Sequence, residues 1–97
     1  IAYGNDRTTP IYIKGADVTT DSHCRILGFN TSKQANFQAA YGSAITTYFT
    51  VEKLGDKYYK VTPILSAMPS GVFLDYLRFS LIGEGKDLII TIDEPIE

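Results

Sequence analysis

Apolar and polar side chains alternate with a period of two along residues 45–63, "ITTYFTVEKLGDKYYKVTP". This is the period of a strand that has one buried face. In the first half the apolar set is Ile45, Phe49 and Val51, and the polar set is Thr46, Tyr48, Thr50 and Glu52. The pattern predicts a β-hairpin that turns in the polar stretch after Leu54.

The register of this hairpin follows from the requirement that apolar residues face apolar residues. A three-residue loop, Gly55 to Lys57, places Val51 opposite Val61 on the buried side and Glu52 opposite Lys60 on the other. A two-residue turn would instead bring Lys60 opposite Val51, which puts a charge on the core side. We therefore predict the three-residue loop.

A second hairpin is predicted in "YLRFSLIGEGKDLIITID", residues 76–93. A four-residue loop, Gly83 to Lys86, places Leu81 opposite Leu88 and Phe79 opposite Ile90. A helix with apolar residues at intervals of four is the alternative, and the tight alternation of β-forming residues favours the hairpin.

The last strand of this hairpin, "DLIITID", is apolar on both faces. A strand added last to a sheet often lies at its edge, where unpaired backbone groups invite another strand. We expect it either to pair with a neighbouring chain or to lie centrally in its own sheet.

One short helix is predicted near residues 32–41. Thr31 and Gln34 have the spacing of a capping box, Phe37 and Tyr41 share a helical face, and Gly42 can end the helix. The segments "TTPIYIK" and "CRILGF" are further strand candidates.

Composition supports a chain made largely of strands. The types with high β propensity are 11 Ile, 10 Thr, 7 Tyr, 5 Phe and 4 Val among 97 residues. We predict one domain, residues 1–97, that is all-β: a small antiparallel β-sandwich with one short helix. An α+β fold is the alternative.

Charge and hydropathy exclude several classes. The net charge is −2, and the nine Lys and Arg residues are scattered, whereas nucleic-acid binding needs a clustered basic footprint. No apolar run approaches the ~20 residues of a membrane span. The chain opens on Ile1 without a basic and apolar leader, which we interpret as a processed chain or a domain cut from a longer one.

The histidine and the cysteine of this chain are adjacent, at His23 and Cys24. On a strand, neighbours point to opposite faces, so they cannot act together as base and nucleophile. We therefore interpret Cys24 as a small buried residue without a catalytic role. Asp17, Asp21 and His23 do not predict a metal site, because at most two of them are local ligands and their spacing does not match that of a zinc site.

The stretch "GEGKD" lacks the spacing and the hydroxyl residue of a phosphate-binding loop, and we interpret it as a turn. No cofactor is predicted.

The predicted binding residues lie on the outward faces of the two hairpins. They are Tyr48, Tyr58, Tyr76 and Arg78, surrounded by several Thr. Tyrosine supplies a large contact area at low entropic cost, which suits a recognition surface. The alternative is that these rings cap sheet edges or pack beneath loops.

Residues 70–82, "SGVFLDYLRFSLI", resemble the last strand of bacterial pilin and spore-coat-type β-sandwich subunits. Gly71, Phe73 and Asp75, followed by the alternating Leu77, Phe79 and Leu81, carry the likeness. The resemblance implies extracellular assembly. The chain departs from those subunits because it is shorter and because "KDLIITIDE" continues where they usually stop.

Together these features predict a non-enzymatic binding or assembly module of a surface, fimbrial or phage-virion protein. Its expected partner is a protein, another copy of itself or a glycan, and its expected location is extracellular, at the cell surface or in a virion. One alternative is a small cytoplasmic regulator or inhibitor that binds a protein. Another is a small hydrolase or lyase that uses dispersed carboxylates.

Overall fold

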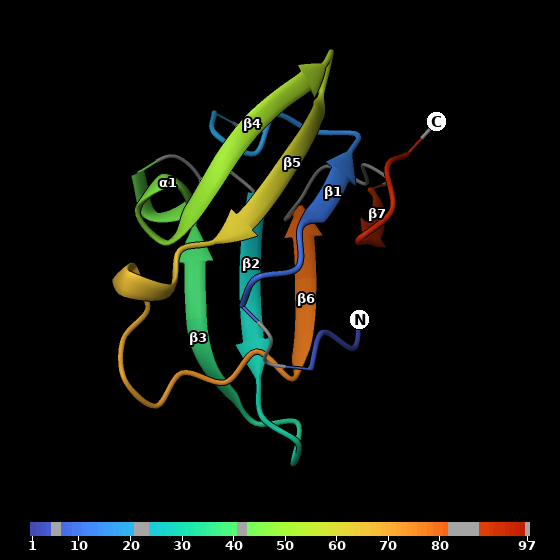
Figure 1. Cartoon of the computed structure of the whole chain (residues 1–97). Helices are drawn as coiled ribbons and strands as arrows, with labels where there is room; N and C mark the ends of the chain where they lie inside the picture. The colour runs from blue at the N-terminus through green and yellow to red at the C-terminus, as the bar shows by residue number, and fades with distance from the viewer. Residues whose placement is uncertain (5–6, 21–23, 41–42, 82–87, 97) are drawn as a thin grey trace.

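The computed structural model describes residues 1–4, 7–20, 24–40, 43–81 and 88–96. Within these ranges the chain is rich in strands and has one short α-helix and one short 3-10 helix (Figure 1). The elements are β1 (Ile11–Lys14), β2 (Cys24–Phe29), β3 (Ala35–Ala40), α1 (Ser43–Tyr48), β4 (Phe49–Gly55), β5 (Tyr58–Pro63), η1 (Leu65–Ala67), β6 (Tyr76–Leu81) and β7 (Ile89–Ile92). The expected β-rich fold with one short helix is confirmed. None of the described helices has the length and apolar character needed to cross a membrane.

The strands form two antiparallel sheets. One sheet has the order β4-β5-β1-β7 and the other the order β3-β2-β6. The chain changes sheet between β1 and β2, between β3 and β4, between β5 and β6, and between β6 and β7, as the colour order in Figure 1 shows. The pairing that holds the molecule together is therefore mostly between segments far apart in the sequence.

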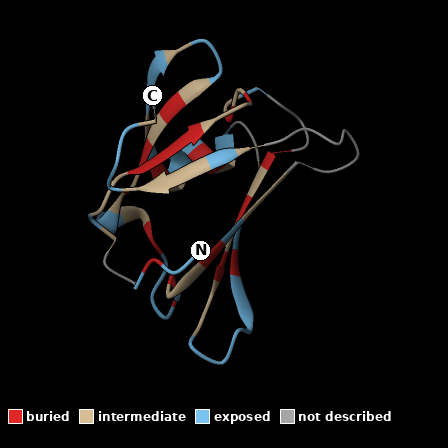
Figure 2. Ribbon diagram, turned by 90° about the vertical axis from the view of Figure 1, so that its right-hand side faces the viewer, coloured by how far each residue is buried: buried red, intermediate tan, exposed pale blue. Residues whose placement is uncertain are grey.

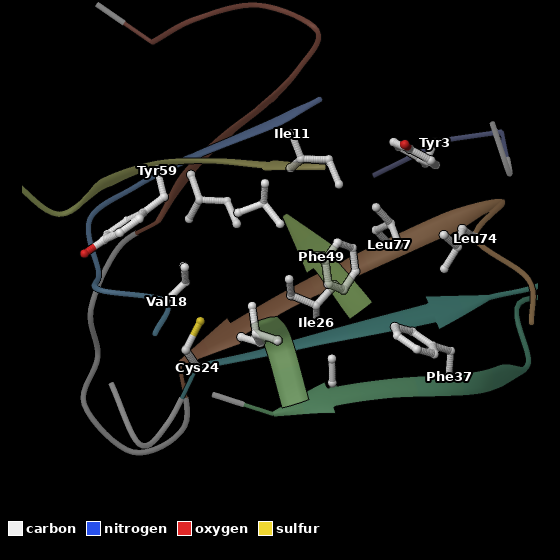
Figure 3. Packing of buried hydrophobic residues seen from close by; sticks show 14 of the residues in the cluster. Tyr3, Ile11, Val18, Cys24, Ile26, Phe37, Phe49, Tyr59, Leu74 and Leu77 are labelled. Atoms are coloured by element: carbon white, nitrogen blue, oxygen red, sulfur yellow. The ribbon is translucent and has the colours of Figure 1, made fainter. Parts of the chain in front are cut away.

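The two sheets share one core, and alternate residues of each strand point into it. Ile11 and Ile13 of β1 and Ile26 of β2 have no exposed surface, and Phe49 of β4 is only 1% exposed. Figure 3 shows Ile11, Ile26 and Phe49 between the strands of the two sheets, and Figure 2 shows buried and less buried segments alternating along the ribbons. Full burial of each such side chain stabilises the fold by roughly 1.5–3 kcal/mol.

The register predicted for the β4–β5 hairpin is confirmed. Val51 lies opposite Val61 and Glu52 opposite Lys60. The loop itself is shorter than predicted, because Gly55 pairs with Tyr58 and a bulge follows Lys53. The bulge adds one residue to β4, so a tight turn at residues 56–57 gives the same facing pairs as a three-residue loop.

The helix predicted near residues 32–41 is wrong, because residues 35–40 are strand β3. A spacing of four places Phe37 and Tyr41 on one face of a helix but equally on one face of a strand, so this signal does not separate the two. Pairing with β2 makes this segment a strand, and the loop before β3 allows that pairing. The backbone N–H of Gln34 donates to the side chain of Asn30, whose amide donates to the side chain of Gln34, and these bonds close a hairpin turn.

The helix lies instead at Ser43–Tyr48, where the sequence predicted the start of a strand. Ile45 is its buried residue. The hydroxyls of Thr46 and Thr47 donate to the carbonyl of Ser43, so the threonines satisfy their polar groups within one turn. Strand β4 therefore begins at Phe49 rather than at Ile45.

The predicted C-terminal hairpin is also wrong. Strand β6 pairs with β2, so Phe79 lies opposite Ile26. Strand β7 pairs with β1 in the other sheet, so Ile90 lies opposite Ile13. The predicted loop, Gly83 to Lys86, lies outside the described residues. Both segments are strands, as the alternation indicated, but alternation does not name the partner strand.

The location of β7 settles one of the two alternatives for the last strand. It is the edge strand of the four-stranded sheet and is not central. Ile89 is 55% exposed there, whereas Ile90 and Ile92 pack against the core. Pairing of this edge with a neighbouring chain stays a prediction.

The segment that leads into β6 crosses the end of the three-stranded sheet at very close range. A Cβ on Gly28 would lie 2.6 Å from the carbonyl oxygen of Phe73 and 2.8 Å from Leu74. The side chain of Asn36 accepts a hydrogen bond from the backbone N–H of Phe73 (3.1 Å) and donates one to the carbonyl of Gly71 (2.8 Å). Strands β2 and β3 thus hold residues 71–74 in place before β6 begins.

We predict that Gly28→Ala destabilises the fold by about 1–3 kcal/mol, because the added methyl group must displace backbone atoms. The matched control is Gly55→Ala, whose Cβ would meet only Tyr58, at an ordinary 3.8 Å. Urea unfolding followed by circular dichroism measures both. Equal stability of the two variants would contradict the close approach at Gly28.

We predict that deletion of residues 88–97 abolishes cooperative thermal unfolding. The deletion removes the strand that pairs with all four residues of β1 and exposes apolar surface that Ile90 and Ile92 cover. A shorter deletion, of residues 93–97, keeps this ladder and serves as the control. A cooperative melt in the longer deletion would show that β7 is dispensable.

Candidate cationic hollow on the three-stranded sheet

Two of the predicted binding residues, Tyr76 and Arg78, lie on the outer face of the three-stranded sheet. They alternate along β6 with Leu77, which is buried. Tyr76 lies opposite Phe29 of β2, and Arg78 lies opposite Leu27. The pairing of β6 with β2 therefore gathers two aromatic rings and a guanidinium group on one surface.

Arg78 is held over an aromatic ring. Its guanidinium carbon lies 5.2 Å from the centroid of the Phe29 ring, within the range of a cation–π contact. Such a contact orients the planar guanidinium while its N–H edges stay available to a ligand. The contact therefore fixes where a positive charge is presented.

An open hollow of about 220 Å³ adjoins this pair. Its lining residues are Ile1, Phe29, Lys33, Tyr76, Leu77 and Arg78. Among the side chains of these described residues two are cationic, two are aromatic and none is acidic. In a chain with a net charge of −2, this is a local surface of the opposite sign.

Lys33 reaches the hollow from the turn between β2 and β3. Its backbone N–H donates to the carbonyl of Asn30 (2.9 Å), and its φ is +62°. Glycine or asparagine adopts this left-handed conformation at lower cost than a lysine. The turn thus holds the lysine at one end of the hollow.

The N-terminal residues form the other side of the hollow. The backbone N–H of Leu77 donates to the carbonyl of Ile1 (2.7 Å), and that of Tyr3 donates to the carbonyl of Asp75 (2.8 Å). The amino group of Ile1 donates to the carbonyl of Leu77. Residues 1–3 therefore extend the sheet beyond β6, on the side away from β2 (Figure 1).

The other two predicted binding residues lie elsewhere. The ring of Tyr48 packs edge-on against Phe37, with ring centroids 5.3 Å apart, so it belongs to the margin of the core. Tyr58 lies on the outer face of the four-stranded sheet, near Tyr12, and its hydroxyl accepts a hydrogen bond from the backbone N–H of Ile96 (2.8 Å). The structure therefore brings together Tyr76 and Arg78 but not Tyr48 or Tyr58.

A second hollow, of about 200 Å³, lies on the outer face of β4 and β5. Its lining consists of Thr50, Thr62, Glu52 and Lys60. Glu52 and Lys60 occupy facing positions, so the charges of this surface are balanced. It lacks both the aromatic walls and the excess charge of the first hollow.

Cys24 is buried, with 1% exposure, on the inward face of β2. The interpretation of this residue as a buried side chain is confirmed, and its lack of a catalytic role stays a prediction. His23 and Asp21 lie outside the described residues. In the part of the chain that the structure describes, no group of three potential ligands is close enough to hold a metal ion.

Asp17 is engaged in a turn. Its carboxylate accepts hydrogen bonds from the backbone N–H of Thr19 (3.0 Å) and from the Thr19 hydroxyl (2.6 Å). These bonds, with those from the hydroxyls of Tyr59 and Thr20, lower the pKa of Asp17 from 3.8 to about 2, although partial burial opposes the shift. Burial, and then the hydrogen bond to Asp17, raise the pKa of Tyr59.

Comparisons with known proteins give no match to this chain: no family model, no curated protein and no solved structure is significantly similar to it. The fold and the hollow define a small β-rich domain with two antiparallel sheets and a cationic, aromatic surface. The likeness of residues 70–82 to pilin-type subunits is therefore supported by the sequence alone.

Phe29 and Lys33 were not predicted from the sequence. In the sequence, Phe29 is the last residue of a short strand candidate, and Lys33 falls within the predicted helix. The pairing of β2 with β6 joins residues about fifty positions apart, and no local pattern specifies it. The signal available in the sequence was the cluster of turn-forming residues around Asn30, which would have placed Lys33 in a hairpin.

The lowered pKa of Asp17 predicts a pH dependence of stability. Because the folded-state pKa lies below the ordinary value, the carboxylate contributes its full stabilisation above about pH 4 and loses it as the pH falls through 2. We expect the wild type to lose about 1 kcal/mol more than Asp17→Asn between pH 5 and pH 2, after allowance for solvent screening.

Urea unfolding across this pH range measures the difference. Thr19→Ala, which removes the hydroxyl bond to Asp17 but keeps the charge, is expected to show part of the same loss. Parallel pH profiles for the wild type and Asp17→Asn would contradict the role of this turn.

Proposed function

We propose that this domain is a non-enzymatic binding and assembly module of a surface, fimbrial or virion protein, and that it contacts a protein or a glycan through the cationic hollow. The observation that carries the proposal is the joint placement of Arg78, Phe29, Tyr76 and Lys33 around one open space. Arginine and tyrosine, like tryptophan, are enriched at binding hot spots.

The chemistry of the hollow supports binding rather than catalysis. The described residues that line it supply no carboxylate, thiol or imidazole. The two described side chains with displaced pKa values, Asp17 and Tyr59, hydrogen-bond to each other. Tyr59 lies at the opposite end of the core from Leu77 (Figure 3). The hollow can hold and orient a ligand, and the perturbed groups lie away from it.

Assembly is supported by the edge of the four-stranded sheet. Strand β7 ends this sheet, and Ile89 is more than half exposed on it. Strands at sheet edges pair readily with strands of other chains. On this proposal the hollow binds the partner while β7 provides a contact between subunits, and the protein acts outside the cell or on a virion surface.

The test uses arrays of glycans and of displayed peptides with the folded domain as the soluble probe. We expect the wild type to bind at least one class of probe, and Arg78→Ala and Tyr76→Ala to weaken this binding at least tenfold. Arg25→Ala is the matched control, because Arg25 lies on the same face, opposite Ser80, but does not line the hollow.

Near-native circular dichroism of all variants would separate a binding defect from misfolding. Absence of binding to every probe, or equal losses in Arg78→Ala and Arg25→Ala, would overturn the proposal.

A further inference from the structure

We infer that the cationic hollow takes a carboxylated sugar ring, such as a uronic or sialic acid residue of a glycan. The inference rests on the proposed binding function and names the class of its ligand. Size gives the first argument. The hollow of about 220 Å³ is smaller than the roughly 300–1,000 Å³ of sites for larger small molecules, so it accommodates a single ring.

Charge gives the second argument. Lys33 and Arg78 stand at the hollow without an acidic residue among the described lining, so an anionic ligand is favoured. Arg78 presents a planar group with paired N–H donors, and this geometry matches the two oxygens of a carboxylate. Lys33 adds a second positive charge from the hairpin turn.

The aromatic walls give the third argument. Phe29 and Tyr76 face each other across β2 and β6, and both are partly exposed. They provide apolar surface beside the charged groups, so the ligand that fits carries an anionic group next to a ring with a less polar face. A bare inorganic anion would leave this surface unused.

The backbone around the hollow argues against an extended peptide. The N–H and carbonyl groups of Leu77 and the carbonyl of Asp75 are already bonded to Ile1 and Tyr3. An added strand therefore has no main-chain partners at these positions of β6. Recognition there must use side chains, which suits a compact ligand.

The same bonds favour a carboxylate over a phosphate. Phosphate sites commonly use several free backbone N–H groups, as at helix N-termini and in backbone nests. The backbone N–H of Leu77 is bonded to Ile1, and that of Lys33 to Asn30. The cationic donors left to a ligand are the side chains of Arg78 and Lys33.

The experiment titrates the domain with matched probes and follows backbone amide signals by nuclear magnetic resonance. Methyl glucuronoside and methyl glucoside differ only at C6, which is a carboxylate in one and a hydroxymethyl group in the other, and methyl sialoside and its methyl ester form a second pair. We expect the acidic member of at least one pair to shift the amides of Phe29, Lys33 and Arg78 and to bind at least tenfold more tightly than its neutral partner.

Variants then test the two cations. We expect Arg78→Lys to weaken binding of the acidic probe about fivefold or more, because it keeps the charge but loses the paired donors. Lys33→Gln is expected to weaken it less, and Arg25→Ala to leave it unchanged. Raising the salt concentration is expected to weaken binding of the acidic probe and not of the neutral one.

The outcomes separate this inference from the proposed function. Equal binding of the acidic and neutral sugars, or tighter binding of glucose 6-phosphate or of an acidic peptide at the same amides, would overturn the carboxylated sugar while the binding function stands. No response of the hollow to any sugar or peptide probe would overturn both.

Discussion

The pairing of β2 with β6 is the interaction on which both the core and the hollow depend. Strand β2 is the central strand of its sheet, and β6 joins it from about fifty residues away. Because side chains alternate between the two faces of the sheet, the β2–β6 ladder supplies residues both to the core and to the hollow. The inward residues Ile26 and Leu77 are buried, while the outward Phe29, Tyr76 and Arg78 line the hollow. A shift of one residue in this register would exchange the two sets.

This register is fixed from outside the ladder. Residues 71–74 approach β2 so closely at Gly28 that only glycine fits, and the side chain of Asn36 bonds to their backbone. At the other edge of β6, the N-terminal residues bond to Leu77 and Asp75. The start of β6 is thus held on both sides. The placement of Tyr76 and Arg78 follows from these contacts as much as from their own side chains.

The parts of the fold that were predicted correctly are those that local chemistry determines. The facing residues of the β4–β5 hairpin follow from a tight turn and from the need to match apolar faces, and the whole hairpin spans fifteen residues of sequence. The partner strands of β6 and β7 cannot be predicted in this way, because the alternation in these two strands suits any apolar face. Residues 35–40 were assigned to a helix because the spacing of Phe37 and Tyr41 is compatible with helix and strand, and pairing with β2 decides between them.

The site was predictable to a similar extent. Tyr76 and Arg78 were identified because they occupy the outward positions of a strand whose inward positions are apolar. Tyr48 was assigned to the same kind of face, but the helix before β4 turns its ring toward Phe37. Phe29 and Lys33 become recognisable only when β2 is paired with β6, since each contributes to the hollow through a partner distant in sequence.

The contacts that fix the hollow also bear on the binding that we propose for it. Arg78 is oriented over Phe29, Lys33 is held by a closed turn, and the backbone beside Leu77 is bonded. These contacts position the three groups without a ligand, so the proposed binding would not have to order the backbone as well. Part of this positioning comes from the folding of the three-stranded sheet itself. A surface of only about six residues can therefore be selective for a small ligand, because its donors and rings are already in position when the ligand arrives.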